Sequence, residues 1–448
     1  MKRSPWRYLW KSYDIRRKLL ITLLLLTIYR VAAHVPVPGV DRDAIQAILS
    51  QGGPGGTLFG LLDLLSGGTV SLFSVLAMGV YPYITAQIII QLLVPIIPAL
   101  QKKMEEDPRE GRRLQERWTY YLAVPMAALN AIGQINIFNS YASTIGTLVI
   151  PDFGFGAGNW LSSLAIVVSM TAGTMFAIWL GELISEFGIR NQGLSLIIFS
   201  GIVSRIPATI QSIIADRENM VWSFLLMVVV TVATILMIVV VQQGRRNIPV
   251  MYPGRRVGSR MSMPVKGTLP LMVNMAGMIP LIFAQSILTF PSIIATFFRT
   301  SSISWVASIA NGIYDVSSGT SNWYWVIYFL MVVIFSFFYT DVLFSQQNYG
   351  DNLKRVGAQI PGVTQGAPTQ RYLTRVLRRI TLPGALFLGI VAVLPWLIGL
   401  VIPFANQSGF LLVNAAGLLI AVGVVRDTFY NIDAELKLHG YDESLLVR

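Results

Sequence analysis

The chain is built from long apolar segments that alternate with shorter polar connections. A helix of about 20 apolar residues crosses the roughly 30 Å hydrocarbon core of a membrane. We predict ten such spans, namely Leu19–Pro38, Ser71–Leu100, Trp118–Phe138, Trp160–Ile184, Leu194–Ile214, Met220–Val241, Leu269–Phe290, Trp323–Phe344, Leu382–Ile402 and Gly409–Val425. Glycine and proline inside several of them are tolerated in membrane helices.

Lysine and arginine are dense in every second connection. Seven precede the first span, and the connections 101–117, 242–267 and 345–381 carry six each. The short turn between the fourth and fifth spans is on the same side and carries Arg190. The connections on the other side carry only Arg42, Arg217 and Arg299. Because Lys- and Arg-rich connections stay in the cytoplasm, this alternation predicts that both termini are cytoplasmic.

Composition agrees with a single polytopic membrane domain. Of the 448 residues, 54% are hydrophobic and 12% are charged, whereas soluble domains carry about 25% charged residues. The chain has no cysteine and two histidines, which excludes disulfides and thiolate metal sites and argues against histidine metal sites. We expect no metal and no cofactor.

Five spans precede Asp216 and five follow it, so we predict two halves, 1–215 and 216–448, related as an inverted repeat. The basic connections 242–267 and 345–381 in the second half are long. Neither is apolar enough to form a domain, and we expect each to project as a hairpin or a partly ordered finger.

One apolar stretch, Thr57–Leu65, is only about half as long as a span. It lies between glycine-rich segments and leads into the second span. Non-helical backbone at membrane depth is tolerated only inside protein or a water-filled cavity. The stretch therefore predicts a re-entrant element on the outer side, although an amphipathic helix on the outer surface fits the composition equally well.

Catalytic signatures are missing from the sequence. It contains no Walker A loop, no GxSxG and no HExxH, and Glu182, Asp341 and Asp427 lie near span ends rather than at the midplane. These features argue against an intramembrane enzyme and an ion-driven carrier. The spans instead hold uncharged polar residues, which either make ordinary interhelical hydrogen bonds or form a polar seam: Thr85, Gln87, Gln91, Asn130, Asn274, Gln285 and Asn414.

Several long motifs are spread over nearly the whole chain. They are VPVPGVD at Val35–Asp41, SGGTVSLFSVLAMGVYPYITAQIIIQLL at Ser66–Leu93, EGRR at Glu110–Arg113, TAGTMFAIWLGELI at Thr171–Ile184, LSLIIFSGIV at Leu194–Val203, LPLMVNMAGMIPLIFAQSI at Leu269–Ile287 and DNLKRVGAQIPG at Asp351–Gly362. In sequence and in order these motifs resemble the SecY family, the channel subunits of the general protein-export machinery.

The resemblance implies an all-α membrane protein with ten transmembrane helices in two pseudo-symmetric five-helix halves around an hourglass pore. The positions that match the pore constriction are Val80, Ile84, Ile198, Ile282 and Ile420. Branched apolar side chains there would exclude water and ions, although core packing or lipid contact would also suit them. Residues at about 57–67 match the plug, with apolar positions Leu58, Phe59, Leu61, Leu62, Leu64 and Leu65.

The second and seventh spans resemble the lateral gate of the family. The residues implied for its polar seam are Thr85, Gln91 and Asn274, with Asn130 contributing from the third span. Such hydrogen bonds are weak enough, at about 0.6–2 kcal/mol each, for the seam to open. A signal sequence, itself an apolar helix, would leave sideways into lipid there.

The two long basic connections resemble the sites that dock the ribosome and the export ATPase. The implied docking residues are Arg245, Arg246, Arg255, Arg256, Arg260, Lys354, Arg355, Arg371 and Arg375. Arginine pairs with rRNA phosphate and with carboxylates; alternatively, the charges only fix topology. The family usually has an arginine soon after the PG of the second loop, where this chain has Thr364.

The resemblance thus implies a passive protein-conducting channel in a prokaryotic cytoplasmic (inner) membrane. Its implied partners are the small subunits SecE and SecG, the SecA ATPase, the ribosome, secretory preproteins with signal sequences, and membrane lipids. A secondary transporter remains the main alternative, and it would need a charged or coordinating site at the midplane.

Overall fold

The computed structural model describes residues 12–41, 73–94, 97–98, 100, 103, 107–144, 149–150, 153–154, 159–215, 220–253, 256–257, 260–261, 265–299, 303–317, 321–401 and 415–438. Most of these residues are helical. The stretch predicted as a plug, Thr57–Leu65, lies outside the described residues.

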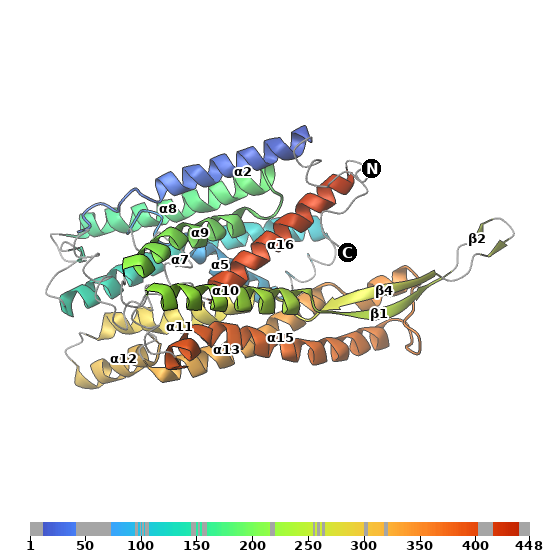
Figure 1. The fold of residues 1–448 in the computed structure, drawn as a ribbon. Coiled ribbons are helices and arrows are strands. Elements are labelled where there is room, and N and C mark those ends of the chain that lie inside the picture. The colour runs from blue at the N-terminus through green and yellow to red at the C-terminus, as the bar shows by residue number, and fades with distance from the viewer. Residues whose placement is uncertain are drawn as a thin grey trace. The chain divides into compact units, whose positions relative to one another are not determined.

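Helices dominate the fold, and each predicted span overlaps one of them (Figure 1). They are α2 (Tyr13–Ala32), α5 (Tyr81–Leu93), α7 (Pro108–Thr144), α8 (Trp160–Phe187), α9 (Gly193–Ala215), α10 (Met220–Gln243), α11 (Ile279–Phe298), α12 (Ser304–Ser317), α13 (Asn322–Gln346), α14 (Tyr349–Arg355), α15 (Ala367–Val401) and α16 (Ala415–Leu438).

Length and hydropathy single out some of these helices as membrane spans. Within the described residues, four helical segments are long and apolar enough to cross a membrane: Arg109–Asn139, Trp160–Phe187, Asn322–Arg355 and Ala367–Leu400. Shorter apolar helices cover Gly193–Ser204, Met227–Gln243 and Ile279–Ser292. The chain therefore has several segments that suit a membrane interior.

The chain packs as two compact units, which are each discontinuous in sequence. The first unit comprises Met1–Val228, Ser286–Trp325 and Pro395–Arg448, and the second comprises Val229–Gln285 and Val326–Leu394. This division follows packing. It does not test the two sequence halves, 1–215 and 216–448, which stay a prediction.

In the first unit, neighbouring helices form a continuous series of contacts. Helix α7 packs against α5 and α8, α8 packs against α2 and α9, and α9 packs against α16. A Cβ atom on Gly173 of α8 would lie 2.1 Å from the carbonyl oxygen of Val75, so only glycine permits this approach. The rings of Phe73 and Phe138 meet edge to face at 4.9 Å in the core beside α8.

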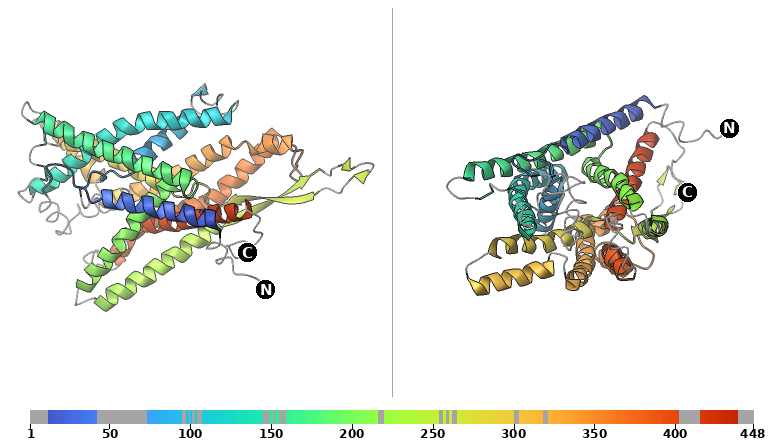
Figure 2. Two further views of the ribbon diagram at one scale, coloured as in Figure 1. Left: turned by 90° about the horizontal axis from the view of Figure 1, so that it is seen from above. Right: turned by 60° about the vertical axis from the view of Figure 1, so that its left-hand side comes forward.

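The second unit joins helices to a β-ribbon. Strands β1 (Arg245–Tyr252) and β4 (Val265–Met272) are antiparallel, with Arg245 opposite Met272. They extend beyond the end of α10 (Figures 1 and 2). Two further short strands, β2 (Arg256–Val257) and β3 (Arg260–Met261), pair with each other. The hairpin expected for 242–267 is therefore confirmed.

The prediction for the seventh span is wrong at its beginning. Residues from Leu269 to Met272 belong to β4, and helix α11 begins only at Ile279. Two features explain the delay. Leu269 pairs with Ile248 across the ribbon, and Gly277 adopts a positive φ of 63°, a conformation that glycine tolerates and that interrupts a helix.

Candidate functional site

Helices α5 and α11, which were predicted to form the gate, meet through hydroxyl groups. The Oγ1 of Thr85 and the Oγ of Ser286 lie 3.4 Å apart, and either can donate. When the single Thr85 hydroxyl proton is donated to the Tyr81 carbonyl at 3.0 Å, Ser286 is the donor in the contact between the helices. Both side chains are buried. Pro82 near the start of α5 has a fixed φ that suits the first turn of a helix, and the helix thereby sets the position of Thr85.

The other residues expected in the polar seam occupy different surroundings. Asn274 is buried, and its amide donates to the Gly277 carbonyl at 3.2 Å within its own turn. Asn130 is buried on α7, and Gln91 is half-buried on α5. The structure thus brings Thr85 to α11, whereas the Asn274 amide bonds within its own turn.

Sequence reasoning missed the partner of Thr85. Ser286 is one of several small polar residues that α11 buries, together with Thr289 and Ser292. The signal was available in the sequence, because a serine or threonine recurs every three residues from Ser286 to Ser292 in an otherwise apolar run. Serine is too common in membrane helices for this spacing alone to identify a contact.

The positions expected at the constriction are all branched and apolar. Val80 precedes α5, and Ile84 is half-buried one turn later. Ile198 on α9 and Ile420 on α16 are buried, and these two helices pack together in the first unit. Ile282 on α11 is buried in the second unit. Their convergence on one pore stays a prediction.

The two long basic connections form one packed body, which we call the paired loops (residues 245–272 and 349–381). Its core includes Ile248, Val250, Ile360 and Leu373, all buried. The backbones of Met251 and Gln359 exchange two hydrogen bonds of 2.8 Å. Apolar side chains from both connections are buried against each other, a packing that the prediction of a hairpin or finger for each connection did not include.

Basic side chains cover the outside of the paired loops. The described docking residues with exposed side chains are Arg245, Arg246, Lys354, Arg355, Arg371 and Arg375. Arg256 and Arg260 lie on β2 and β3, whereas Arg255 lies outside the described residues. The buried apolar core thus supports an exposed cationic surface, which suits an anionic partner.

Thr364, which stands where the family usually has an arginine, is exposed just before α15. Its carbonyl accepts a hydrogen bond of 2.8 Å from the hydroxyl of Thr369. Gly362 and Gly366 on either side have φ values of 81° and 92°. This turn therefore depends on backbone conformation and on a threonine hydroxyl, and it lacks a charge at the usual position.

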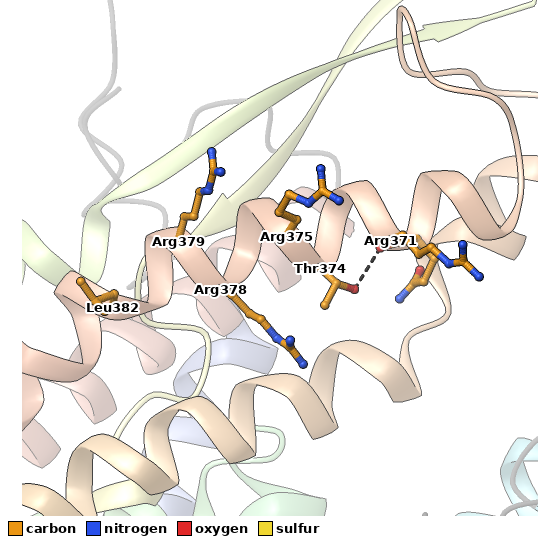
Figure 3. A pocket seen from close by; sticks show the side chains of 7 residues that line it. Arg371, Thr374, Arg375, Arg378, Arg379 and Leu382 are labelled. Atoms are coloured by element: carbon orange, nitrogen blue, oxygen red, sulfur yellow. Dashed lines mark hydrogen bonds between the residues drawn. The ribbon is translucent and has the colours of Figure 1, made fainter.

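One ion pair links α13 to α15 within the second unit. Arg378 donates to Oδ2 of Asp341 from Nη2 at 2.8 Å and from Nε at 3.1 Å, and its Nε also lies 3.3 Å from Oδ1. Figure 3 shows Arg378 directed away from Arg375 and Arg379. Asp341, which the sequence placed near a span end, is thus paired with the guanidinium group of Arg378.

The described residues offer little for catalysis. No group of three or more His, Cys, Asp or Glu side chains that could hold a metal occurs among them. What this part of the chain provides is a weak hydroxyl contact between helices, branched apolar positions and an exposed cationic body. These features suit passage and docking better than bond chemistry.

Comparison with known proteins supports the same interpretation. The SecY family model matches residues 74–429. A protein translocase subunit SecY from Streptomyces scabiei is 35% identical over 439 residues, covering 96% of this chain and 97% of the relative.

Solved structures of channels share the fold at low sequence identity. One is a SecY protein whose plug domain is described as stabilising the closed channel and maintaining a membrane seal, with a TM-score of 0.61. Another is Sec61 in the canine ribosome–channel complex from the endoplasmic reticulum, with a TM-score of 0.58. Each is 18% identical and covers 97% of this chain and 94% of that chain.

The family model covers most of the chain, and the Streptomyces relative matches nearly all of it at 35% identity. This chain belongs to the SecY family.

Proposed function

We propose that this chain is the protein-conducting channel of a general secretory pathway. It passes unfolded polypeptides across a membrane as a passive pore and is not an enzyme. The observation that carries this proposal is the match of nearly the whole chain to a protein translocase subunit. The channel folds of the solved structures support it.

The proposed pore is closed by a ring of apolar side chains and a plug. The ring consists of Val80, Ile84, Ile198, Ile282 and Ile420, and the plug of residues at about 57–67. A narrow apolar constriction excludes water and ions, yet it binds no particular peptide sequence. The plug reported for a SecY structure of the same fold supports the assignment of the stretch from Thr57.

A lateral gate between α5 and α11 would release apolar helices into lipid. Its support is the 3.4 Å contact between the hydroxyls of Thr85 and Ser286. Hydrogen bonds between membrane helices contribute only about 0.6–2 kcal/mol. An apolar signal sequence can therefore insert between the two helices and break this contact. The same apolar surface is stable in lipid, so the signal sequence can then leave sideways. Gln91, Asn130 and Asn274 complete the proposed seam.

The paired loops would dock the partners that supply energy. Their exposed arginines suit rRNA phosphate and protein carboxylates, and the canine Sec61 of similar fold was solved on a ribosome. We propose the ribosome and the SecA ATPase as partners, with SecE and SecG as small membrane subunits. Because Thr364 lacks the usual charge, either Arg371, Arg375 or the connection 242–267 would take its place, or the connection 345–381 would couple differently to the ATPase.

We further propose ten transmembrane helices in a prokaryotic inner membrane, with both termini in the cytoplasm. The overlap of every predicted span with a helix supports the count. The alternation of Lys and Arg supports the orientation. Two five-helix halves, 1–215 and 216–448, would then open about the connection between the fifth and sixth spans.

Replacing the proposed ring tests the channel against a secondary transporter. In vesicles that contain the assembled translocase, Ile84→Asn with Ile282→Asn should raise the resting ion leak severalfold, because polar side chains hydrate the constriction. Ile89→Asn on α5, also half-buried but outside the ring, is the matched control. Unchanged leak together with lost uptake of a small solute would instead support a carrier.

A further inference from the structure

Helix α12 packs against the last turns of α11 within the first unit (Figure 1). Ala310 and Tyr314 of α12 share a small buried core with Ala295 of α11. The guanidinium group of Arg299 lies 4.1 Å from the centroid of the Tyr314 ring, and its Nε donates to Oδ1 of Asn311 at 2.9 Å. These contacts fix the rotation of α12 about its own axis.

The exposed surface of α12 is divided into two faces. Its apolar face consists of four residues with exposed fractions between 38% and 68%, namely Trp305, Ile309, Ile313 and Val316. Its polar face consists of four exposed residues at a similar spacing, namely Ser304, Ser308, Asn311 and Asp315. Residues three or four positions apart share one side of a helix, whereas consecutive residues are about 100° apart around it. The helix therefore turns one apolar and one polar face outward.

The connection that contains α12 offers little to a charged partner. From 291 to 322 the sequence has only two charged residues, Arg299 and Asp315. Arg299 is engaged by Tyr314 and Asn311. A nucleic acid or a strongly acidic protein would thus find few charges to bind, and it would leave the apolar face uncovered.

Short connections keep α12 close to the predicted spans on either side. Only residues 299–303 separate it from α11, and only residues 318–321 separate it from α13. Because an extended chain covers at most about 3.6 Å per residue, the ends of α12 lie within roughly 20 Å of the adjoining ends of those two helices. The segment that includes α13 is long and apolar enough to cross a membrane. Helix α12 therefore stays near the outer boundary of the membrane.

A boundary between lipid and water suits a helix with these two faces. Apolar side chains there reach the acyl chains while polar side chains stay hydrated. Trp305 in the first turn of α12 and Trp323 near the start of α13 are exposed by 68% and 67%, and tryptophan is enriched at this boundary. Ile294 and Phe298 on the adjoining turns of α11 are exposed as well, so α11 adds to the apolar surface.

We propose that α12 is an interfacial helix whose apolar face lies among the acyl chains of the outer leaflet, while its polar face meets water. Because the apolar face carries no charged side chain, it contacts the hydrocarbon of lipids and selects no headgroup. The proposal rests on the membrane setting of the proposed function, but it does not require transport.

Labels on the two faces test this placement directly. The chain has no cysteine, so a fluorophore can be attached singly to Ile309→Cys or Ile313→Cys on the apolar face. Ser304→Cys and Ser308→Cys are the matched positions on the polar face. The assembled translocase, without cargo, is reconstituted in vesicles whose phosphatidylcholine carries a nitroxide on its acyl chains. The nitroxide should quench labels on the apolar face severalfold more than those on the polar face, and aqueous iodide should do the reverse.

Two controls make the test specific. Leu330→Cys reports ordinary lipid contact, because Leu330 is 53% exposed on α13, and the nitroxide should quench it as strongly as the apolar face of α12. Replacing phosphatidylcholine by phosphatidylglycerol with the same nitroxide should leave the pattern unchanged. A requirement for phosphatidylglycerol would mean recognition of a headgroup and would contradict the proposal.

Three further results would overturn it. Protection of Ile309→Cys and Ile313→Cys from both quenchers, with Leu330→Cys quenched by the nitroxide, would mean that protein covers the apolar face. Equal quenching of both faces by iodide would place the whole helix in water. Failure of the nitroxide to quench Leu330→Cys would contradict the membrane span of α13, and with it the proposed function. A translocase that fails in transport but keeps the predicted pattern would still support the placement of α12.

Discussion

The contact between α5 and α11 and the paired loops use polar groups in opposite ways. At the contact, the hydroxyls of Thr85 and Ser286 are buried and meet at 3.4 Å. In the paired loops, the apolar side chains of Ile248 and Leu373 are buried, and the arginines around them are exposed. The polar atoms therefore join elements in one region and face outward in the other.

This difference indicates which region is built to separate and which to stay together. A single hydroxyl contact between membrane helices contributes little, about 0.6 kcal/mol on average. A buried leucine contributes several times more, since replacing it with alanine costs about 2–5 kcal/mol. We infer that the helix contact opens while the paired loops remain a rigid support for charged docking residues.

The largest expected effect comes from the core of the paired loops. Leu373→Ala should destabilise this body by about 2–5 kcal/mol, because the side chain is completely buried and leaves a cavity. Limited proteolysis of the purified full chain should then cut within 345–381 much faster. Leu386→Ala, at an exposed position of the same helix, is the control and should change little. Equal cutting of both variants would mean that the two connections do not support each other.

The next effect concerns the positive charge of the connection 242–267. Arg255→Glu with Arg256→Glu should weaken ribosome binding on the order of a hundredfold at low salt, and should flatten its salt dependence because fewer counterions are released. Binding would be measured by co-sedimentation with ribosomes across a salt series, and insertion into the membrane should persist.

Reversing Arg112 and Arg113 on α7 gives the same change in net charge elsewhere. If ribosome binding is as strong in Arg255→Glu/Arg256→Glu as in wild type, the charges of the connection 242–267 serve topology only.

The smallest effect concerns the proposed gate. Thr85→Val removes the hydroxyl that meets Ser286 and keeps the side-chain shape, so opening should become easier by about 0.6 kcal/mol, or roughly threefold. Transport of a preprotein with a weakened signal sequence should rise accordingly. Thr174→Val is the control, since that hydroxyl bonds to Met170 within α8. A rise that is equal in both variants would exclude a specific role for the contact.

The sequence predicted the features that depend on neighbouring residues. Apolar length located the helices, and polar and apolar alternation agrees with the hairpin, where Ile248 and Val250 are buried and Asn247 and Pro249 are exposed. The motif at Leu194–Val203 and its neighbours identified the family, which the comparisons confirm.

Features set by distant contacts could not be predicted. The core shared by Ile248 and Leu373 joins residues more than a hundred positions apart, and neither connection alone is apolar enough to indicate it. The beginning of α11 depends on β4 pairing with β1 and on the conformation of Gly277. Ser286 became a candidate only once α5 was seen beside it.

The central claim is that an unfolded polypeptide passes through the interior of this chain. Because the chain has no cysteine, single cysteines at Ile84 and Ile282 can be crosslinked selectively to a secretory chain arrested during transport. The account predicts crosslinks from both positions to the arrested segment, and none from a cysteine at the exposed position Leu386. Crosslinks from Leu386 alone, with none from Ile84 or Ile282, would contradict it.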